Sequence, residues 1–416
     1  MKSNSVWQNW YLKLFPSLMR SQRRIVRGRW RPSQGHSLLA AQVQILESRL
    51  LLSTITVNNA SDPAGAHTGT TLRDAVAQVN AASGPSTIVF DPAINGLPIQ
   101  LSQGQFTITN SVTIQGNTAS TTTIDGGKLS RVFAVSGAAI NATFDHVTIT
   151  GGKTTAASQP GAGIDFTSKG TLTVVNSTIS GNSTTGIGSN GGGIYSTFGT
   201  VVVTGSTLSG NTTLGQSAWG GAIDAVSGAV TLTDSTITGN STAGNSAFGG
   251  AVASPFGNIT LNSSTLARNS TTGQYSSGGG IYSRVGSITL TNSIVALNTI
   301  QSGGYPDIFS NFVLGATLTA SHSLLGNKQG TLLLYAPPGS PDANGNLVGA
   351  PAAPINPLLG NLANNGGPTQ TLALLAGSPA LKGGGTTTLI YDQRGNPFKR
   401  LGTGGVDDMG AFEATT

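Results

Sequence analysis

The fold is decided by residues 220–240, which read Gly220-Gly221-Ala222-Ile223-Asp224, then Val230-Thr231-Leu232-Thr233, then Ser235-Thr236-Ile237-Thr238-Gly239-Asn240 after short spacers. The same phrase recurs, with small changes, before and after this stretch. Its last residue belongs to a series spaced 29 residues apart: Asn182, Asn211, Asn240, Asn269, Asn298 and Asn327. A fixed period of this length indicates a solenoid, in which each unit buries its apolar face only by stacking on its neighbours.

Each repeat holds three short runs rich in Val, Ile, Leu and Thr, separated by Gly, Ser and Asn. The alternation in residues 230–233 has the period of a strand, and no run has the length or spacing of a helix. Three strands per repeat predict one coil of an all-β, parallel β-helix, and the crossover rule predicts that it is right-handed. Residues 99–330 would hold about eight coils, on the order of 40 Å long at about 4.8 Å per coil.

The six asparagines allow two interpretations. They could mark tight turns where the left-handed αL conformation is tolerated, with each side chain bonding to backbone or to the asparagine one coil away. They could instead bind a ligand at every coil. We favour the structural interpretation, because every coil needs its turns stabilised whereas a ligand rarely needs six identical rungs.

The flanking regions differ in composition from the repeats. Residues 54–98 predict an N-terminal cap of strand, helix and strand, whose helix at 71–80 places Leu72, Val76 and Val79 on one face to cover the open end of the stack. Residues 331–353 are rich in Pro, Gly and Ala and predict a linker or long loop. Residues 354–416 are expected to form a C-terminal module.

Charge is concentrated at the N-terminus. Residues 1–46 carry eight Lys and Arg and no acid, which leaves 13 of the 21 basic and all 15 acidic residues, a net charge of −2, for the rest. A nearly neutral body does not suit a nucleic-acid groove. The chain has no cysteine, so disulfides and thiolate metal sites are excluded.

Residues 1–53 predict a basic export leader. The apolar stretch that follows the basic arm is interrupted by Gln42, Gln44, Glu47 and Arg49, so no transmembrane helix is expected there. The core of this leader, residues 46–53, resembles the Leu-Glu-Pro-Arg leader of planctomycete surface and secreted proteins, with Ser48 in place of proline. This resemblance implies an extracellular or cell-surface location.

The C-terminal module is similar to the choice-of-anchor module of bacterial surface proteins. The similarity rests on Asp392-Gln393-Arg394-Gly395 and on Gly410-Ala411-Phe412-Glu413, while Lys382 stands where that module usually carries an aspartate. Within the module we expect salt bridges among Asp392, Arg394, Asp407 and Glu413.

Together, residues 54–416 resemble secreted β-helix proteins with polymorphic-outer-membrane-protein-like repeats. That resemblance implies surface display or secretion and seldom a defined activity. We expect a monomer whose partners are cell-surface glycans or envelope components, with no cofactor.

One column of the repeat could carry chemistry. Asp165, Tyr195, Asp224, Ala253 and Tyr282 each follow an aliphatic residue of the same phrase, so they should point outward where the aliphatic residues point inward. Asp165 and Asp224 would lie two coils apart, roughly 9–10 Å, near the upper end of the separation in inverting glycosidases, with Tyr195 between them as a sugar platform.

Two functions follow from these patterns. The first is a non-catalytic structural or adhesive element, in which the column is a solvated stripe with no basic partner and Tyr195 and Tyr282 are candidate binding residues. The second is a glycan-active hydrolase or lyase that uses Asp165 and Asp224. We favour the first, because repeats of constant length leave no inserted loops to wall a cleft. Trp219 and Phe248, one period apart, are interpreted as turn packing, and His36, His67, His146 and His322 lack metal-ligand spacing.

Overall fold

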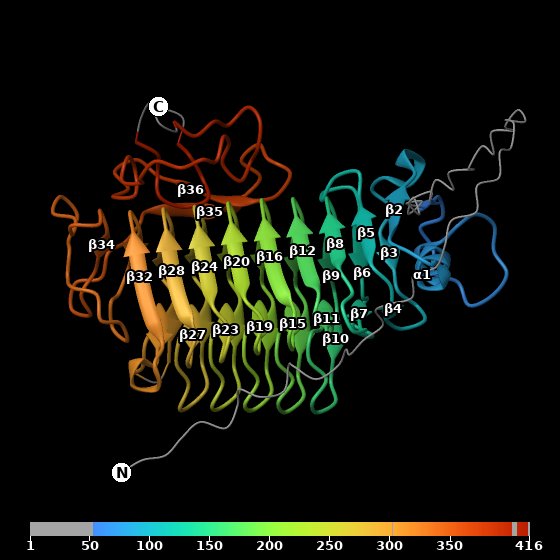
Figure 1. Ribbon diagram of the computed structural model, residues 1–416, viewed down its shortest axis with the longest axis horizontal. Coiled ribbons are helices and arrows are strands. Elements are labelled where there is room, and N and C mark those ends of the chain that lie inside the picture. Colours follow the sequence, from blue (N-terminus) through green and yellow to red (C-terminus); the bar gives the residue numbers. More distant parts are fainter. Residues whose placement is uncertain (1–52, 302, 402–405, 415–416) are drawn as a thin grey trace, which may run out of the picture. The chain divides into compact units, whose positions relative to one another are not determined.

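The computed structural model describes residues 53–301, 303–401 and 406–414, so the predicted leader at residues 1–52 lies outside the described residues. The described chain is a parallel β-helix of about nine turns (Figure 1). The predicted fold class is confirmed. About eight coils were expected, and the stack is longer because the two strands of the expected N-terminal cap also join it.

Sheet A has ten parallel strands. They are β1 Ser53–Val57, β2 Ser86–Phe90, β5 Val112–Gln115, β8 Ala142–Asp145, β12 Thr171–Val175, β16 Thr200–Thr204, β20 Val230–Thr233, β24 Ile259–Asn262, β28 Ser287–Thr291 and β32 Thr317–Ser321. Sheet B also has ten. They are β3 Ile99–Gln100, β6 Thr123–Asp125, β9 Thr148–Thr150, β13 Thr178–Ser180, β17 Thr207–Ser209, β21 Thr236–Thr238, β25 Thr265–Ala267, β29 Ile294–Ala296, β33 Leu324–Leu325 and β34 Leu347–Val348.

Sheet C has eight parallel strands. They are β4 Phe106–Ile108, β7 Phe133–Val135, β11 Ile164–Phe166, β15 Ile194–Ser196, β19 Ile223–Ala225, β23 Val252–Ser254, β27 Ile281–Ser283 and β31 Ile308–Ser310. A fourth sheet, D, consists of two-residue strands that the sequence did not predict. They are β10 Lys153–Thr154, β14 Ser183–Thr184, β18 Thr212–Thr213, β22 Ser241–Thr242, β26 Ser270–Thr271 and β30 Thr299–Ile300. Such short strands carry no alternation that could reveal them.

The core is a set of aliphatic ladders inside the coils. On sheet C, Ile194 pairs in register with Ile164 and Ile223, and all three are fully buried. Burying one such side chain stabilises the fold by about 1.5–3 kcal/mol, and each added regular coil contributes one more isoleucine or valine to this ladder.

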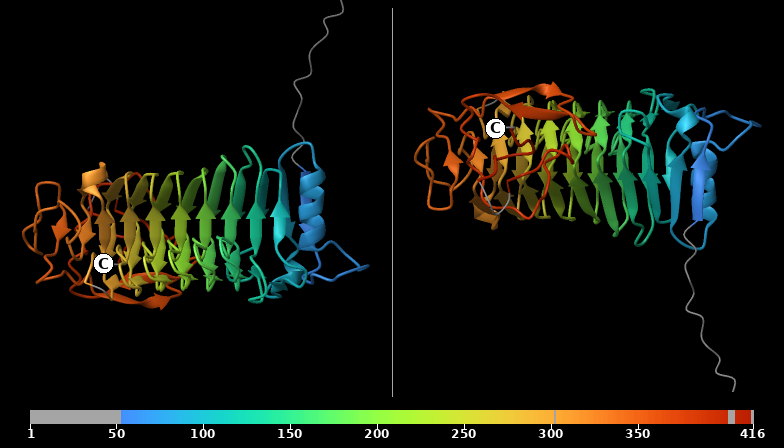
Figure 2. Two further views of the ribbon diagram at one scale, coloured as in Figure 1. Left: turned by 90° about the horizontal axis from the view of Figure 1, so that it is seen from below. Right: turned by 90° about the horizontal axis from the view of Figure 1, so that it is seen from above.

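The N-terminal end of the stack is covered by helix α1 (Leu72–Ala81), which Figure 2 shows lying across it. Thr71 caps the helix in a reciprocal capping box with Asp74. Leu72, Val76 and Val79 are buried against the stack, as the spacing predicted. Two single-turn 3₁₀ helices, Pro92–Ile94 and Phe312–Leu314, lie in connections.

The C-terminal end is less regular. Residues 331–353, expected as a linker or loop, contain β34, which pairs parallel with β33 and adds a last strand to sheet B. The C-terminal module follows with an antiparallel pair, β35 (Leu359–Ala363) and β36 (Thr371–Leu374), which lies alongside the stack in Figure 1. No helix among the described residues is long and apolar enough to span a membrane.

The asparagines form a buried ladder of amide hydrogen bonds. Asn182 Nδ2 donates to Asn211 Oδ1 at 3.0 Å, and the same bond repeats to Asn240, Asn269 and Asn298. Each Oδ1 also accepts the backbone N–H of the preceding asparagine. Every rung therefore holds two neighbouring coils at the same register.

Two details of the predicted ladder are wrong. The left-handed position is the residue before each asparagine, such as Gly181 or Arg268, while the asparagine itself turns inward. Asn327 does not continue the series, because Asp307 accepts from Asn298 Nδ2 at 2.8 Å and takes the next place. A carboxylate only accepts hydrogen bonds, so it ends the ladder without leaving an unpaired amide N–H.

Replacing Asn240 by alanine should destabilise the protein by about 1–3 kcal/mol. The change leaves the backbone N–H of Asn211 without its acceptor, and a buried unsatisfied group costs about 1–3 kcal/mol. Asn269 Oδ1 and the Asn211 amide each lose one partner but keep another, the backbone N–H of Asn240 and the Ile179 carbonyl oxygen. Denaturant unfolding measures the loss. The exposed Asn344→Ala is the control, and an equal, small effect of both variants would contradict a stabilising ladder.

Candidate functional site

The column that could carry chemistry lies on sheet C. Strand pairing places Asp165, Tyr195, Asp224, Ala253 and Tyr282 in one register, and Phe309 of β31 extends it. The repeat spacing predicted this alignment.

The prediction of a solvated stripe is wrong. Asp224 is 0% exposed and Tyr282 is 7% exposed. A second column packs against the first. It consists of Asn190, Trp219 and Phe248, which are spaced 29 residues apart and each directly precede a pair of glycines. Asn190 Nδ2 donates to Asp224 Oδ2 at 2.7 Å, and Trp219 and Phe248 contact the Tyr282 ring. Turn residues cover the outward face because the turns before each Gly-Gly pair fold back over sheet C.

The two carboxyl groups of the column differ in surroundings. Burial raises the pKa of Asp224 to about 8, against the opposing effect of the Asn190 hydrogen bond, so this carboxyl is mostly neutral at pH 7. Burial also raises the pKa of Asp165, and nearby Arg131 opposes that rise. The side chain of Asp165 keeps 15% of its surface exposed.

Asp165 has a basic partner that the sequence did not reveal. Arg131 Nη2 lies 3.3 Å from Asp165 Oδ2, and the same guanidinium donates to the carbonyl oxygens of Pro160 and Gly161. Arg131 comes from an irregular coil, one turn before the regular repeats, so the 29-residue period does not point to it.

Tyr195 lies between the two acids in the register. Burial raises the pKa of its hydroxyl, and the neighbouring Asp224 and Asp165 raise it further, while a hydrogen bond with Thr197 lowers it. The arrangement therefore keeps Tyr195 protonated. Glycoside hydrolysis also requires a general acid that the substrate can reach, and Asp224 is fully buried.

The aromatic residues form a continuous stack along the coils. The Phe248 and Tyr282 rings lie 4.7 Å apart at 26°, Tyr282 and Phe309 lie 5.4 Å apart at 12°, and Trp219 and Tyr305 contact this stack at either side. Both faces of the Tyr282 ring are thus covered by other rings. Tyr282, a predicted binding residue, packs in the stack, and the interpretation of Trp219 and Phe248 as packing agrees with these contacts.

Asp224→Asn should remove a pH dependence of stability. Below pH 4 the carboxyl is neutral in both folded and unfolded chains; between about pH 4 and 8 the unfolded chain ionises while the folded chain keeps its proton, so stability falls as pH rises. The variant should equal the parent at pH 4 and exceed it in thermal midpoint at pH 8.

Asp165→Asn is the contrasting control, because it leaves Arg131 without its carboxylate and should lower stability at pH 8. Parallel pH profiles of the parent and Asp224→Asn would show that Asp224 is not buried as described.

A second polar cluster joins the C-terminal module to the stack. Asp392 and Arg394 form a salt bridge at 2.6 Å, and the Arg394 guanidinium lies 3.8 Å from the ring centroids of both Phe398 and Phe412. The backbone N–H of Glu413 donates to Asp392 Oδ2 at 2.7 Å. Asp392, Arg394 and Glu413 are thus brought together, and the buried Asp407 lies close enough to Glu413 to interact with it electrostatically.

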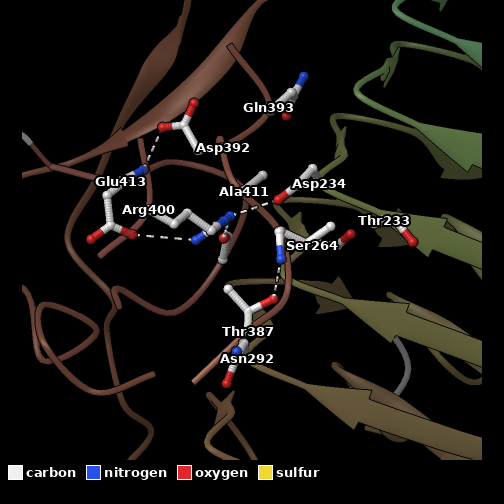
Figure 3. A network of polar contacts seen from close by, with 12 residues as sticks. Thr233, Asp234, Ser264, Asn292, Thr387, Asp392, Gln393, Arg400, Ala411 and Glu413 are labelled. Carbon is white, nitrogen blue, oxygen red and sulfur yellow. Dashed lines mark hydrogen bonds and ion pairs between the residues drawn. The ribbon is translucent and has the colours of Figure 1, made fainter. Parts of the chain in front are cut away.

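The sequence missed the residues that cross from the module to the coils. Arg400 Nη2 lies 2.7 Å from Asp234 Oδ1 on the stack, while its Nη1 lies 3.3 Å from Glu413 Oε2 (Figure 3). Burial raises the pKa of Asp234 to about 6 and that of Glu413 to about 7, and Arg400 opposes both shifts. Asp234 follows a strand of one repeat and had no distinguishing signal in sequence.

Gln393 supplies a further contact that sequence reasoning passed over. Its Oε1 accepts from Thr236 Oγ1 at 2.6 Å, and its Nε2 donates to Ser206 O and Thr207 Oγ1 on the neighbouring coil. One buried side chain therefore joins two successive coils of sheet B to the module.

Arg400→Met should lower stability by about 3–5 kcal/mol, because it leaves Asp234 and Glu413 buried without their cation. The loss should be greater at pH 8 than at pH 5, since both acids must then ionise inside the protein. Denaturant unfolding at the two pH values measures it, with the exposed neighbour Lys399→Met as control. Equal stability of the two variants would contradict a stabilising role for the ion pairs of Arg400 with Asp234 and Glu413.

The comparisons with known proteins assign the chain to no family. No protein-family model matches the chain, and no curated protein matches it. Among the described residues, no cluster of three or more His, Cys, Asp or Glu could hold a metal ion.

Proposed function

We propose that the protein is an exported structural or adhesive element of the cell surface, without catalytic activity. The observation that carries the proposal is that the polar groups on the repeat face are already engaged by neighbouring side chains. Asp224 is closed off and hydrogen-bonded, Asp165 is paired with Arg131, and Tyr282 lies between two rings. Groups that a hydrolase would present to a polysaccharide instead hold successive coils together.

The regularity of the stack supports a mechanical role. The amide ladder repeats the same contact between coils, and the Arg400 and Gln393 contacts fasten the C-terminal module along sheet B. A rod of this kind presents a long surface at little cost in conformational entropy, which suits adhesion to surface glycans or envelope components. The leader-like composition of residues 1–53 supports export.

The alternative is a glycan-active enzyme that uses Asp165 and Asp224. One observation favours it: the raised pKa of Asp224, about 8, is what a general acid needs at neutral pH. Its complete burial opposes the idea, because a substrate would reach the carboxyl only after the covering turn residues moved.

The test is made on protein recovered from the cells that produce it. The protein should be found at the surface or in the medium with an N-terminus near residue 54, and it should release no reducing ends or unsaturated products from a panel of polysaccharides. Edman sequencing and product assays measure these outcomes.

Intact leader on soluble cytoplasmic protein would refute export. Polysaccharide turnover that is abolished by Asp224→Asn would replace the structural proposal with the enzymatic one. Ser227→Ala, a substitution outside the column, serves as the control for that loss.

A further inference from the structure

A cavity of about 630 Å³ lies where the C-terminal module meets the end of the stack. Its lining comes from residues 338–347, which follow β33, and from residues 379–386 of the module, together with His322, Val406 and Met409. The volume is within the range of small-molecule sites, about 300–1,000 Å³. Because both regions contribute, the cavity exists only when the module is docked.

Main chain forms much of the wall. Pro338, Pro341 and Pro379 have restricted backbones, and residues 383–385 are three consecutive glycines. A Cβ on Gly383 would lie 2.9 Å from Met409 Cε, and one on Gly384 would lie 2.7 Å from the Asp407 carbonyl oxygen. Gly384 therefore packs directly against main chain, where a larger residue would not fit.

His322 is held in a defined position at the cavity. A Cβ on Gly385 would lie 2.7 Å from its Nδ1, and one on Gly345 would lie 2.6 Å from its Cδ2, so both glycines make room for the ring. Ser321 Oγ lies 3.0 Å from Nδ1. In the tautomer in which this hydroxyl donates to Nδ1, the other ring nitrogen carries a proton that it can donate to an anion.

Lys382 is the second basic residue of the lining. Its backbone N–H donates to Asp408 Oδ1 at 2.7 Å, which fixes the start of the glycine segment. The structure records no ion pair for its ammonium among the described residues. No acid lines the cavity, although two lie near. Asp408 accepts two backbone N–H groups. Asp342 accepts from Asn344 and Asn346, and it also interacts electrostatically with His322, which leaves Lys382 as the lining base without an acidic partner among the described residues.

The geometry points to a binding site for a small carboxylate in this cavity, with Lys382 and His322 receiving the carboxylate and Pro338, Leu381 and Met409 contacting the apolar side of the ligand. Two bases without a lining acid favour an anion. The apolar wall suits a body such as the C–H face of a pyranose ring. A uronic acid of an acidic surface polysaccharide combines both features.

The site would give the proposed surface element its ligand, and in that sense it rests on the proposed function. The two can fail separately. Binding is measured on purified protein and does not depend on export, whereas surface location does not depend on the cavity.

The test is calorimetric titration of the full chain with trigalacturonate and with its neutral methyl ester. The acid should bind, and the ester should bind at least about tenfold more weakly, the loss expected for one hydrogen bond to a charged group. Lys382→Met should weaken binding of the acid by a similar factor, and so should His322→Asn, which retains a residue that tolerates the positive φ of this turn.

Lys399→Met removes an exposed positive charge from the same module outside the cavity and should leave binding unchanged. Thermal midpoints within the error of the parent show that the variants are folded. No binding of the acid, equal binding of the ester, or equal losses in Lys382→Met and Lys399→Met would overturn the proposal.

Discussion

The structure depends on the amide ladder inside the coils. A parallel β-helix can only stack if every turn returns the chain to the same register, and each asparagine enforces this with a side-chain bond and a backbone bond to the next coil. An amide has both a donor and an acceptor, so the pattern can repeat without leaving a buried polar group unpaired. Asp307 ends the series where the coils become irregular.

Regular stacking has a consequence for the outer faces. Side chains at equivalent positions lie about 4.8 Å apart, so a column of similar residues packs on itself. On sheet C, Tyr282 stacks on Phe309, its equivalent one coil further on, and the turn residue Phe248 also stacks on Tyr282. On sheet B the threonines Thr207 and Thr236 receive Gln393 of the module. Faces that a sequence pattern assigns to solvent are therefore covered by the chain itself.

The groups that remain available to bind a ligand lie at the irregular end of the stack and not on the repeat face. The repeat face has its carboxyl groups closed off or paired, whereas the junction with the C-terminal module combines a cavity, two bases and a wall of glycine and proline residues. Irregular segments can form a concave site because they escape the constraint that each coil match its neighbour. In the function proposed above, the rod would support a binding site at its end.

The sequence by itself determined the β-helix, its 29-residue register, the capping helix and the alignment of the Asp165 column, because these follow from local periodicity that repeats along the chain. It did not reveal Arg131 beside Asp165, Arg400 between Asp234 and Glu413, or the burial of Asp224. Those contacts join residues up to 166 positions apart or come from irregular turns. Only the tertiary structure decided them, since the free energy of a buried charge depends on which distant groups pack around it.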